Sequence, residues 1–137
     1  MTTLTTETVR ITIDAPFDQV VSDLSDPVTH PEWGTEFFSG PAAPSGDGEV
    51  LATVPLMGGE VHMKVDADPA AGRIDLYLAP RQAPFGPPLP IRVVPNADGV
   101  DVLFTLARFP GQSDDEWEGG LVSMARELTK LKSRHER

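Results

Sequence analysis

Residues 8–14, with the sequence TVRITID, alternate strictly between apolar and polar side chains. Val9, Ile11 and Ile13 fall on one face, and polar residues fall on the other. A period of two residues is typical of a β-strand with one buried face. We therefore predict a half-buried strand near the start of the chain.

A short amphipathic helix is predicted directly after this strand. Asp14 suits the N-cap position, and Pro16 suits the first turn, where a backbone N–H has no partner within the helix. Residues 26–33 contain two prolines and have room for one more short helical turn. Apolar residues at helical spacing extend the first helix to about residue 24: Phe17, Val20, Val21 and Leu24.

Between residues 35 and 109 the pattern changes to short strands separated by clusters of Gly, Pro, Asp and Asn. Gly58-Gly59 is a strong two-residue hairpin signal, and the turn at residues 96–99 predicts another hairpin. Residues 80–90 hold prolines at positions 80, 84, 87, 88 and 90, which predicts a loop or lid over one end of the sheet rather than a regular strand. The predicted strands cover residues 49–57, 60–67, 73–79, 91–95 and 100–109.

The last element is a long amphipathic helix that starts after Ser113. Ser113 is its predicted N-cap, and Glu116 completes a capping box. At about 1.5 Å per residue, about twenty residues give a helix of about 30 Å. Gly119-Gly120 weakens the helix by roughly 1 kcal/mol per glycine relative to alanine, which predicts that a sheet or a ligand approaches there. The apolar stripe is Trp117, Leu121, Met124, Leu128 and Leu131, and the opposite face carries Arg126, Glu127, Lys130 and Ser133.

Together these elements predict an α+β fold. A curved antiparallel sheet of about six to seven strands would wrap around the long C-terminal helix, with two short helices after the first strand. The strand connections after residue 35 are too short for crossover helices, so neighbouring strands are predicted to be antiparallel. A strongly curved sheet around one helix leaves space between them, which predicts a cavity. With 137 residues, the chain 1–137 is predicted to form a single domain.

Composition narrows the possible functions. The formal charge of −10 and the sequence pI of about 4.5 would repel a phosphate backbone, so nucleic acid is not an expected partner. The absence of cysteine excludes disulfides and thiolate chemistry. Because no segment resembles a signal peptide or a membrane span, we expect a cytoplasmic, bacterial protein without membrane insertion. Basic residues near the C-terminus fit either a favourable helix dipole or a binding patch: Arg126, Lys130, Lys132, Arg134 and Arg137.

Both ends of the chain resemble a known superfamily. The opening TVRITIDAPFDQVVSDLSDPVTHPEW is similar to the first strand and helix pair of the START-like, polyketide-cyclase-like (SRPBCC) superfamily of helix-grip proteins. The ending, an acidic helix start followed by GLVSMARELTKLK, is similar to the closing helix of that superfamily. The middle departs from familiar members, above all at residues 80–90. The superfamily includes lipid carriers, hormone receptors and aromatic-polyketide cyclases, so the resemblance implies a fold and an apolar cavity but no single reaction.

The predicted ligand is therefore a small apolar molecule, lipid-like or polyketide-like. The same apolar side chains could instead form a filled core, in which Trp33 would be an anchor. No cofactor is predicted, and three scattered histidines without His-x-x-x-His spacing predict no metal site. The predicted ligand contacts are Trp33, Met63, Leu76, Phe104, Leu106, Arg108, Trp117, Leu121 and Met124.

Arg108 is the first candidate for chemistry. If Phe104 and Leu106 face the cavity, alternation places Arg108 on the same side at the end of the strand. A guanidinium there could hold a carboxylate or stabilise an enolate. The alternative is that the strand twists at its end and Arg108 either reaches water or pairs with Asp114 or Asp115.

The remaining candidates are His30 and Glu36, which flank the predicted second helical turn. A histidine beside a carboxylate can transfer protons near neutral pH. The alternative for His30 is a solvated loop residue. His62 is predicted to be solvated on the polar face of its strand, His135 to lie in a frayed tail, and Tyr77 to point outward.

Three functions remain open from the sequence. The first is binding of a small hydrophobic molecule between the sheet and the C-terminal helix. The second is a cyclase or dehydratase acting on a polyketide-like compound in the same cavity. The third is protein association through the outer face or the 80–90 loop, with a vestigial cavity. The chain is expected to be a monomer or a homodimer.

Overall fold

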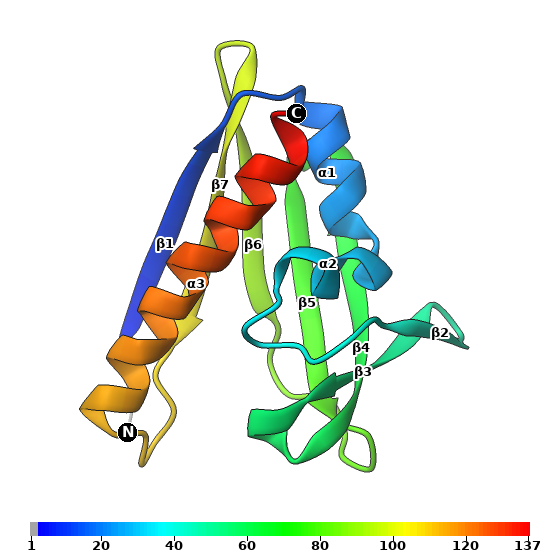
Figure 1. Ribbon diagram of the computed structural model, residues 1–137, viewed down its shortest axis with the longest axis vertical. Coiled ribbons are helices and arrows are strands. Elements are labelled where there is room, and N and C mark those ends of the chain that lie inside the picture. Colours follow the sequence, from blue (N-terminus) through cyan, green and yellow to red (C-terminus); the bar gives the residue numbers. More distant parts are fainter. Residues whose placement is uncertain (1–2) are drawn as a thin grey trace.

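The computed structural model describes residues 3–137, and it confirms the predicted α+β architecture. One antiparallel sheet of seven strands lies behind three helices, which all cover its concave face (Figure 1). Across the sheet the strands follow the order β1 (Thr6–Ile13), β7 (Gly99–Ala107), β6 (Leu89–Asn96), β5 (Arg73–Pro80), β4 (Gly59–Asp68), β3 (Glu49–Val54) and β2 (Ala43–Gly46). The helices are α1 (Phe17–Ser25), α2 (His30–Trp33) and α3 (Asp114–His135).

The first and the last strands of the chain pair with each other. Val9 lies opposite Phe104, and Ile13 lies opposite Val100, so β1 becomes an edge of the sheet beside β7. A Cβ at Gly99 would lie 2.5 Å from the carbonyl oxygen of Ile13, so the start of β7 needs a glycine for this close approach. The alternation that predicted β1 is confirmed, and its inward face leads to the fully buried Ile13.

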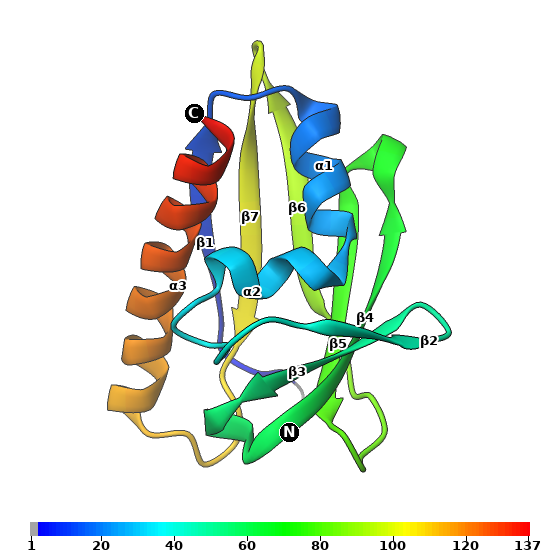
Figure 2. The same cartoon turned by 45° about the vertical axis from the view of Figure 1, so that its right-hand side comes forward.

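Helix α3 lies beside β1, as Figure 2 shows. Its start is the predicted capping box: the Ser113 hydroxyl accepts from the Glu116 N–H at 3.1 Å, and the Glu116 carboxylate accepts from the Ser113 N–H at 3.0 Å. The prediction that a sheet approaches Gly119-Gly120 is wrong, because a Cβ at either position would meet no neighbouring atom within 4 Å. The glycine pair therefore lies at an open part of the helix surface.

A buried apolar cluster fills the space between the sheet and the helices. Alternate residues of each central strand point into it, which is the expected consequence of the two-residue period. Helix α1 adds Val20, Val21 and Leu24, and α3 adds Leu128 and Leu131. The strands contribute Val50, Ala52, Val54, Val61, Met63, Ile74, Leu76, Ile91, Val93, Val100, Val102 and Phe104.

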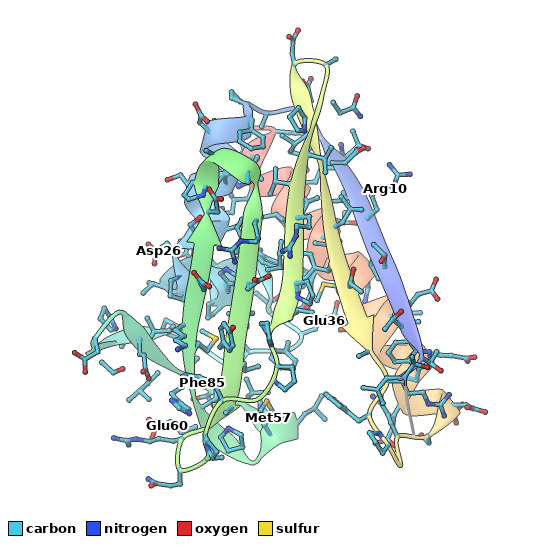
Figure 3. All side chains as sticks on the ribbon, turned by 180° about the vertical axis from the view of Figure 1, so that it is seen from behind. Arg10, Asp26, Glu36, Met57, Glu60 and Phe85 are labelled. Atoms are coloured by element: carbon cyan, nitrogen blue, oxygen red, sulfur yellow. The ribbon has the colours of Figure 1, made fainter. Side chains whose placement is uncertain are left out.

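The middle of the chain differs from the prediction in the limits of its strands and in the course of one loop. Strand β6 begins at Leu89 and includes Pro90, and β2 is a short exposed edge strand that the pattern did not predict. Residues 81–88 form a loop, but this loop does not cover the concave face. Its Phe85 packs on the outer face of the sheet, against His62 of β4, with 4.1 Å between the ring centroids (Figure 3). The outer face accepts Phe85 because His62 presents a flat ring there.

Candidate functional site

The apolar stripe of α3 changes from exposed to buried along its length. Leu128 and Leu131, in the second half of the helix, have no exposed surface. Trp117, Leu121 and Met124, in the first half, are partly exposed. The second half of α3 therefore packs against the core, while the first half leaves apolar surface open.

The concave face of the sheet shows the same change at the same end of the molecule. On β7, Val102 and Phe104 are buried, whereas Leu106 is partly exposed. Leu89 at the start of β6 and Leu78 near the end of β5 are also only partly buried. We call this set the apolar rim; it comprises Leu78, Leu89, Leu106, Trp117, Leu121 and Met124.

Behind the rim, four of the nine predicted ligand contacts form a packed interior. Trp33, Met63, Leu76 and Phe104 are at most 6% exposed. The indole of Trp33 packs edge-on against Phe104, with 5.7 Å between the ring centroids and 82° between the planes. Trp33 is thus placed as the core anchor that the sequence left as an alternative.

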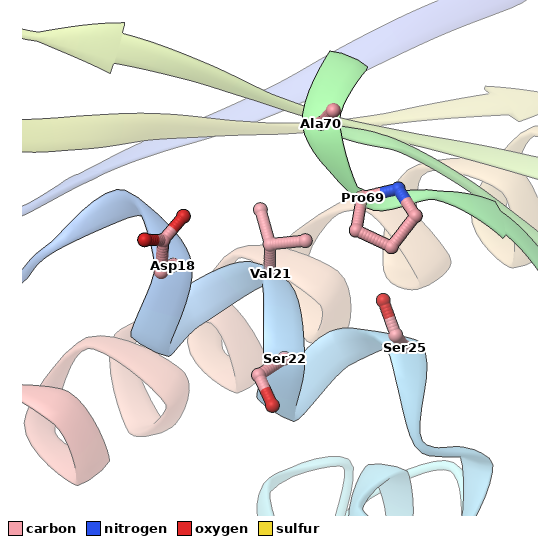
Figure 4. A pocket seen from close by; sticks show the side chains of 6 residues that line it. All are labelled: Asp18, Val21, Ser22, Ser25, Pro69 and Ala70. Carbon is pink, nitrogen blue, oxygen red and sulfur yellow. The ribbon is translucent and has the colours of Figure 1, made fainter.

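Two surface hollows occur in other parts of the structure. One, of about 340 Å³, lies between α1 and the turn after β4 and is drawn in Figure 4. The other, of about 310 Å³, lies between the N-terminal residues and the loop after β7. Their linings are Asp18, Val21, Ser22, Ser25, Pro69 and Ala70 for the first, and Thr3, Leu4, Thr5 and residues 108–112 for the second.

Arg108 is held beside the start of α3. Its guanidinium donates to the Gln112 carbonyl at 2.8 Å and to the Asp114 carboxylate at 2.7 Å. Arg108 is therefore paired with Asp114, as the alternative interpretation of the sequence predicted. Its charge is neutralised there and is not directed at the packed interior.

His30 is buried rather than solvated, so that prediction is wrong. Its ring is 1% exposed, and Nε2 donates to the Leu24 carbonyl at 2.8 Å. Burial lowers the pKa of His30, because the charged ring would lose its hydration, although the Leu24 carbonyl acts in the opposite direction. A neutral imidazole therefore joins the end of α1 to α2.

Glu36 is bound to α3. Its carboxylate accepts from Ser123 at 2.8 Å and from Arg126 at 2.8 and 2.7 Å. Hydrogen bonds from Arg126 and then Ser123 lower the pKa of Glu36 to about 2. Arg108, His30 and Glu36 thus have separate partners, and the structure does not bring them together.

Glu127 is buried in α3, with only 2% of its surface exposed. The prediction that it lies on the polar face, opposite the apolar stripe, is therefore wrong. One carboxylate oxygen accepts from the backbone N–H groups of Glu36 and Phe37, each at 3.0 Å. Burial raises its pKa, although these two N–H groups act in the opposite direction. Its positions three residues after Met124 and four before Leu131 could have identified it as inward-facing.

The end of α3 is attached to α1 by a charged cluster. The Asp23 carboxylate accepts from Arg134 Nε at 2.9 Å, from Arg134 Nη2 at 3.0 Å and from His135 Nε2 at 2.8 Å. Burial alone would raise the pKa of Asp23, but the hydrogen bonds from Arg134 and His135 outweigh it and lower the pKa. His135 is 5% exposed within the helix, so the predicted frayed tail is wrong.

The outer face of the sheet carries an aromatic cluster. His62 is half-buried there, which corrects the solvated prediction: it contacts Phe85, the Ala83 carbonyl at 2.8 Å and the Glu49 carboxylate at 3.2 Å. Tyr77 points outward as predicted, and its ring lies 5.9 Å from that of Phe85. This cluster fixes the 81–88 loop on the outer face.

Comparison with known proteins identifies the fold. No family model matches the chain, and no curated protein matches it in sequence. The solved Aha1 dimer from Colwellia psychrerythraea is 18% identical, with a TM-score of 0.71 over 97% of each chain. A protein from Deinococcus radiodurans is 19% identical, with a TM-score of 0.64 over 96% of this chain and 98% of its own. DynU16, from the dynemicin biosynthetic locus, is 18% identical, with a TM-score of 0.58 over 93% of this chain and 46% of its own.

These structural neighbours have the helix-grip fold, and the chain shares it. At such low sequence identities the likeness concerns the fold alone. Among residues 3–137, no helix is both long and apolar enough to cross a membrane.

Proposed function

We propose that this protein binds a small hydrophobic molecule, lipid-like or polyketide-like, between the concave face of the sheet and the first half of α3. The observation that supports the proposal is the change of exposure along α3, from the buried Leu128 and Leu131 to the partly exposed Trp117 and Leu121. A group of exposed apolar residues on a protein commonly marks a binding site. Partly exposed apolar residues also lie on the concave face of β5, β6 and β7, at the same end of the sheet.

Entry of the ligand requires the first half of α3 to move, because the interior behind the rim is packed. The second half is held in place by Asp23 and by the contact of Lys132 Nζ with the Thr12 carbonyl at 2.8 Å. The first half contains Gly119-Gly120, which weakens the helix. We therefore assign the movement to the part of α3 before Met124, which would break the hydrogen bonds of Asp114 with Arg108 and of Ser123 with Glu36.

The cyclase or dehydratase alternative requires at least two polar groups that converge on one pocket. Arg108 is bound to Asp114, His30 to Leu24 and Glu36 to Arg126. Since each of the three groups is bound to a different partner, the geometry supports binding rather than catalysis.

Protein association is a separate candidate function. Leu56 is 87% exposed at the turn between β3 and β4, and Phe109 is 68% exposed after β7. The similar fold of the Aha1 dimer supports a homodimer as the assembly to test. Sedimentation velocity over a range of protein concentrations would reveal such a dimer, and Leu56→Ser should weaken it if Leu56 is in the contact. Sedimentation as a monomer at every concentration would contradict this alternative.

Binding can be tested with N-phenyl-1-naphthylamine, an uncharged dye that fluoresces in apolar surroundings. Leu121→Arg places a charge in the rim and should weaken dye binding at least about tenfold, because the charge would lose hydration when the ligand enters. Val122→Arg is the matched control, since Val122 is the next residue of α3 and is 54% exposed. Equal dye binding by both variants would contradict the proposed site.

A further inference from the structure

Trp33 has a buried hydrogen-bond donor without an acceptor. The residue is 3% exposed, and its indole Nε1 is buried with no hydrogen-bond partner among the described residues. Most buried polar groups in folded proteins are paired, and an unpaired one destabilises the fold. An unpaired donor of this kind therefore needs an explanation.

The polar side chain that packs against Trp33 already has another partner. His30, whose ring centroid lies 5.5 Å from that of Trp33, donates to the Leu24 carbonyl. His30 thus has a fixed partner, whereas no described residue accepts a hydrogen bond from the indole N–H of Trp33.

Trp33 lies next to the inner edge of the apolar rim. It packs against Phe104, and Phe104 is two residues before the rim residue Leu106 on the same face of β7. Two residues along a strand span about 7 Å. A molecule that enters past Leu106 would therefore reach the surroundings of Trp33 after one further layer of side chains.

We propose that the ligand has an apolar body and one uncharged hydrogen-bond acceptor, such as a ketone, ester or ether oxygen, and that Trp33 Nε1–H binds this oxygen. The inference rests on the proposed function, because it requires a ligand at the rim. An indole nitrogen can only donate, so it selects an acceptor.

The charges of the site argue against a carboxylate in this position. Burying an ionised carboxylate without a cation is costly. In sequence, Arg108 precedes the first half of α3 and Arg126 follows it. The guanidinium group of Arg108 is bound to Asp114, and that of Arg126 is bound to Glu36. An uncharged acceptor needs only the indole N–H.

A matched pair of probes tests the inference: 2-undecanone, and 2-methyl-1-undecene, in which the carbonyl oxygen is replaced by a methylene group of similar shape. Both would be titrated as competitors of N-phenyl-1-naphthylamine. We expect the ketone to bind at least about tenfold more tightly than the alkene, because only the ketone accepts a hydrogen bond. In ¹H–¹⁵N spectra, the indole proton of Trp33 should shift downfield with the ketone and not with the alkene.

Trp33→Phe identifies the Trp33 indole signal by its loss, since Trp117 is the other tryptophan of the chain. In this variant the ketone should bind as weakly as the alkene, while the affinity of the alkene stays nearly unchanged. If the variant does not fold, the two probes on the natural protein still decide the matter.

Each other outcome contradicts the inference in a recognisable way. Equal affinities with an unmoved indole signal would refute the role of Trp33 and leave the proposed binding function intact. A nuclear Overhauser effect between a long-lived water and the Trp33 indole proton in the free and ketone-bound protein would show that water is the partner, and would also refute it. Failure of both probes to displace the dye would refute the inference together with the proposed function.

Discussion

Asp23→Asn should destabilise the protein strongly, because it removes the carboxylate that joins α1 to the end of α3. The Asp23 side chain is 11% exposed and accepts two hydrogen bonds from Arg134 and one from His135, across a sequence separation of more than 100 residues. Breaking a buried charge pair by removing one partner costs about 3–5 kcal/mol. Arg134 retains 26% exposure and can be partly rehydrated, so we expect a loss of about 2–3 kcal/mol.

The measurement is urea unfolding monitored by circular dichroism. The comparison requires that the free energy of unfolding depends on urea concentration with the same slope in each variant. Glu32→Gln is the matched control: Glu32 also binds Arg134, at 2.8 Å, but it is 51% exposed. Exposed ion pairs contribute about 0–1 kcal/mol, so the control should stay near the natural protein. A loss below about 1 kcal/mol for Asp23→Asn would refute the assignment of this cluster as the attachment of α3 to α1.

Three further predictions concern pH and the helix. The pKa of Asp23 is lowered from 3.8, so the stabilising effect of its carboxylate is present above that pH and is lost as the pH falls through the pKa of the folded protein. The stability difference between the natural protein and Asp23→Asn should therefore shrink between about pH 5 and pH 2, as measured by urea unfolding at each pH. Burial raises the pKa of Glu127, so its ionisation opposes folding increasingly as the pH rises above 4.5. At pH 7, Glu127→Gln should keep a hydrogen-bond acceptor and unfold at an equal or higher urea concentration than the natural protein, whereas Glu127→Leu should lose about 1–3 kcal/mol of stability by leaving two N–H groups unpaired. A Glu127→Leu variant more stable than Glu127→Gln would contradict this account. Gly119→Ala and Gly120→Ala should each stabilise the protein by about 1 kcal/mol in thermal unfolding, since a Cβ there meets no neighbouring atom, and destabilisation would show that the helix surface is not open.

The elements that the sequence predicted well are those whose signals lie within a few residues. The capping box of α3 needs only Ser113 and Glu116, and the alternation of β1 needs only its own residues. The antiparallel pairing from β2 to β7 follows from short connections between consecutive strands, whereas the pairing of β1 with β7 joins strands from opposite ends of the chain. For these features the local pattern and the tertiary structure agree, as expected for a sequence that folds to one structure.

The candidate site was harder to predict because polar residues depend on partners far along the chain. The sequence predicted a solvated His62, a His135 in a frayed tail, and a His30 that either transfers protons or lies in a solvated loop, yet each ring is mostly buried beside an acceptor. Glu127 contacts the backbone of residues about 90 positions earlier, at Glu36 and Phe37. The pattern of apolar and polar residues within one helix or strand cannot identify a hydrogen-bond partner that lies so far away in the sequence.

The sequence by itself determined the fold class, the order of the elements and the apolar stripe of α3, because hydrophobic periodicity within each element directs one face inward. Only the tertiary structure decided how deep each part of that stripe lies. The second half of α3 is held against the core by Asp23, which is on another helix, while the first half remains at the open end of the sheet. Burial is a property of the assembled layers, so the apolar rim and the unpaired Trp33 indole could be located only once those layers were in place.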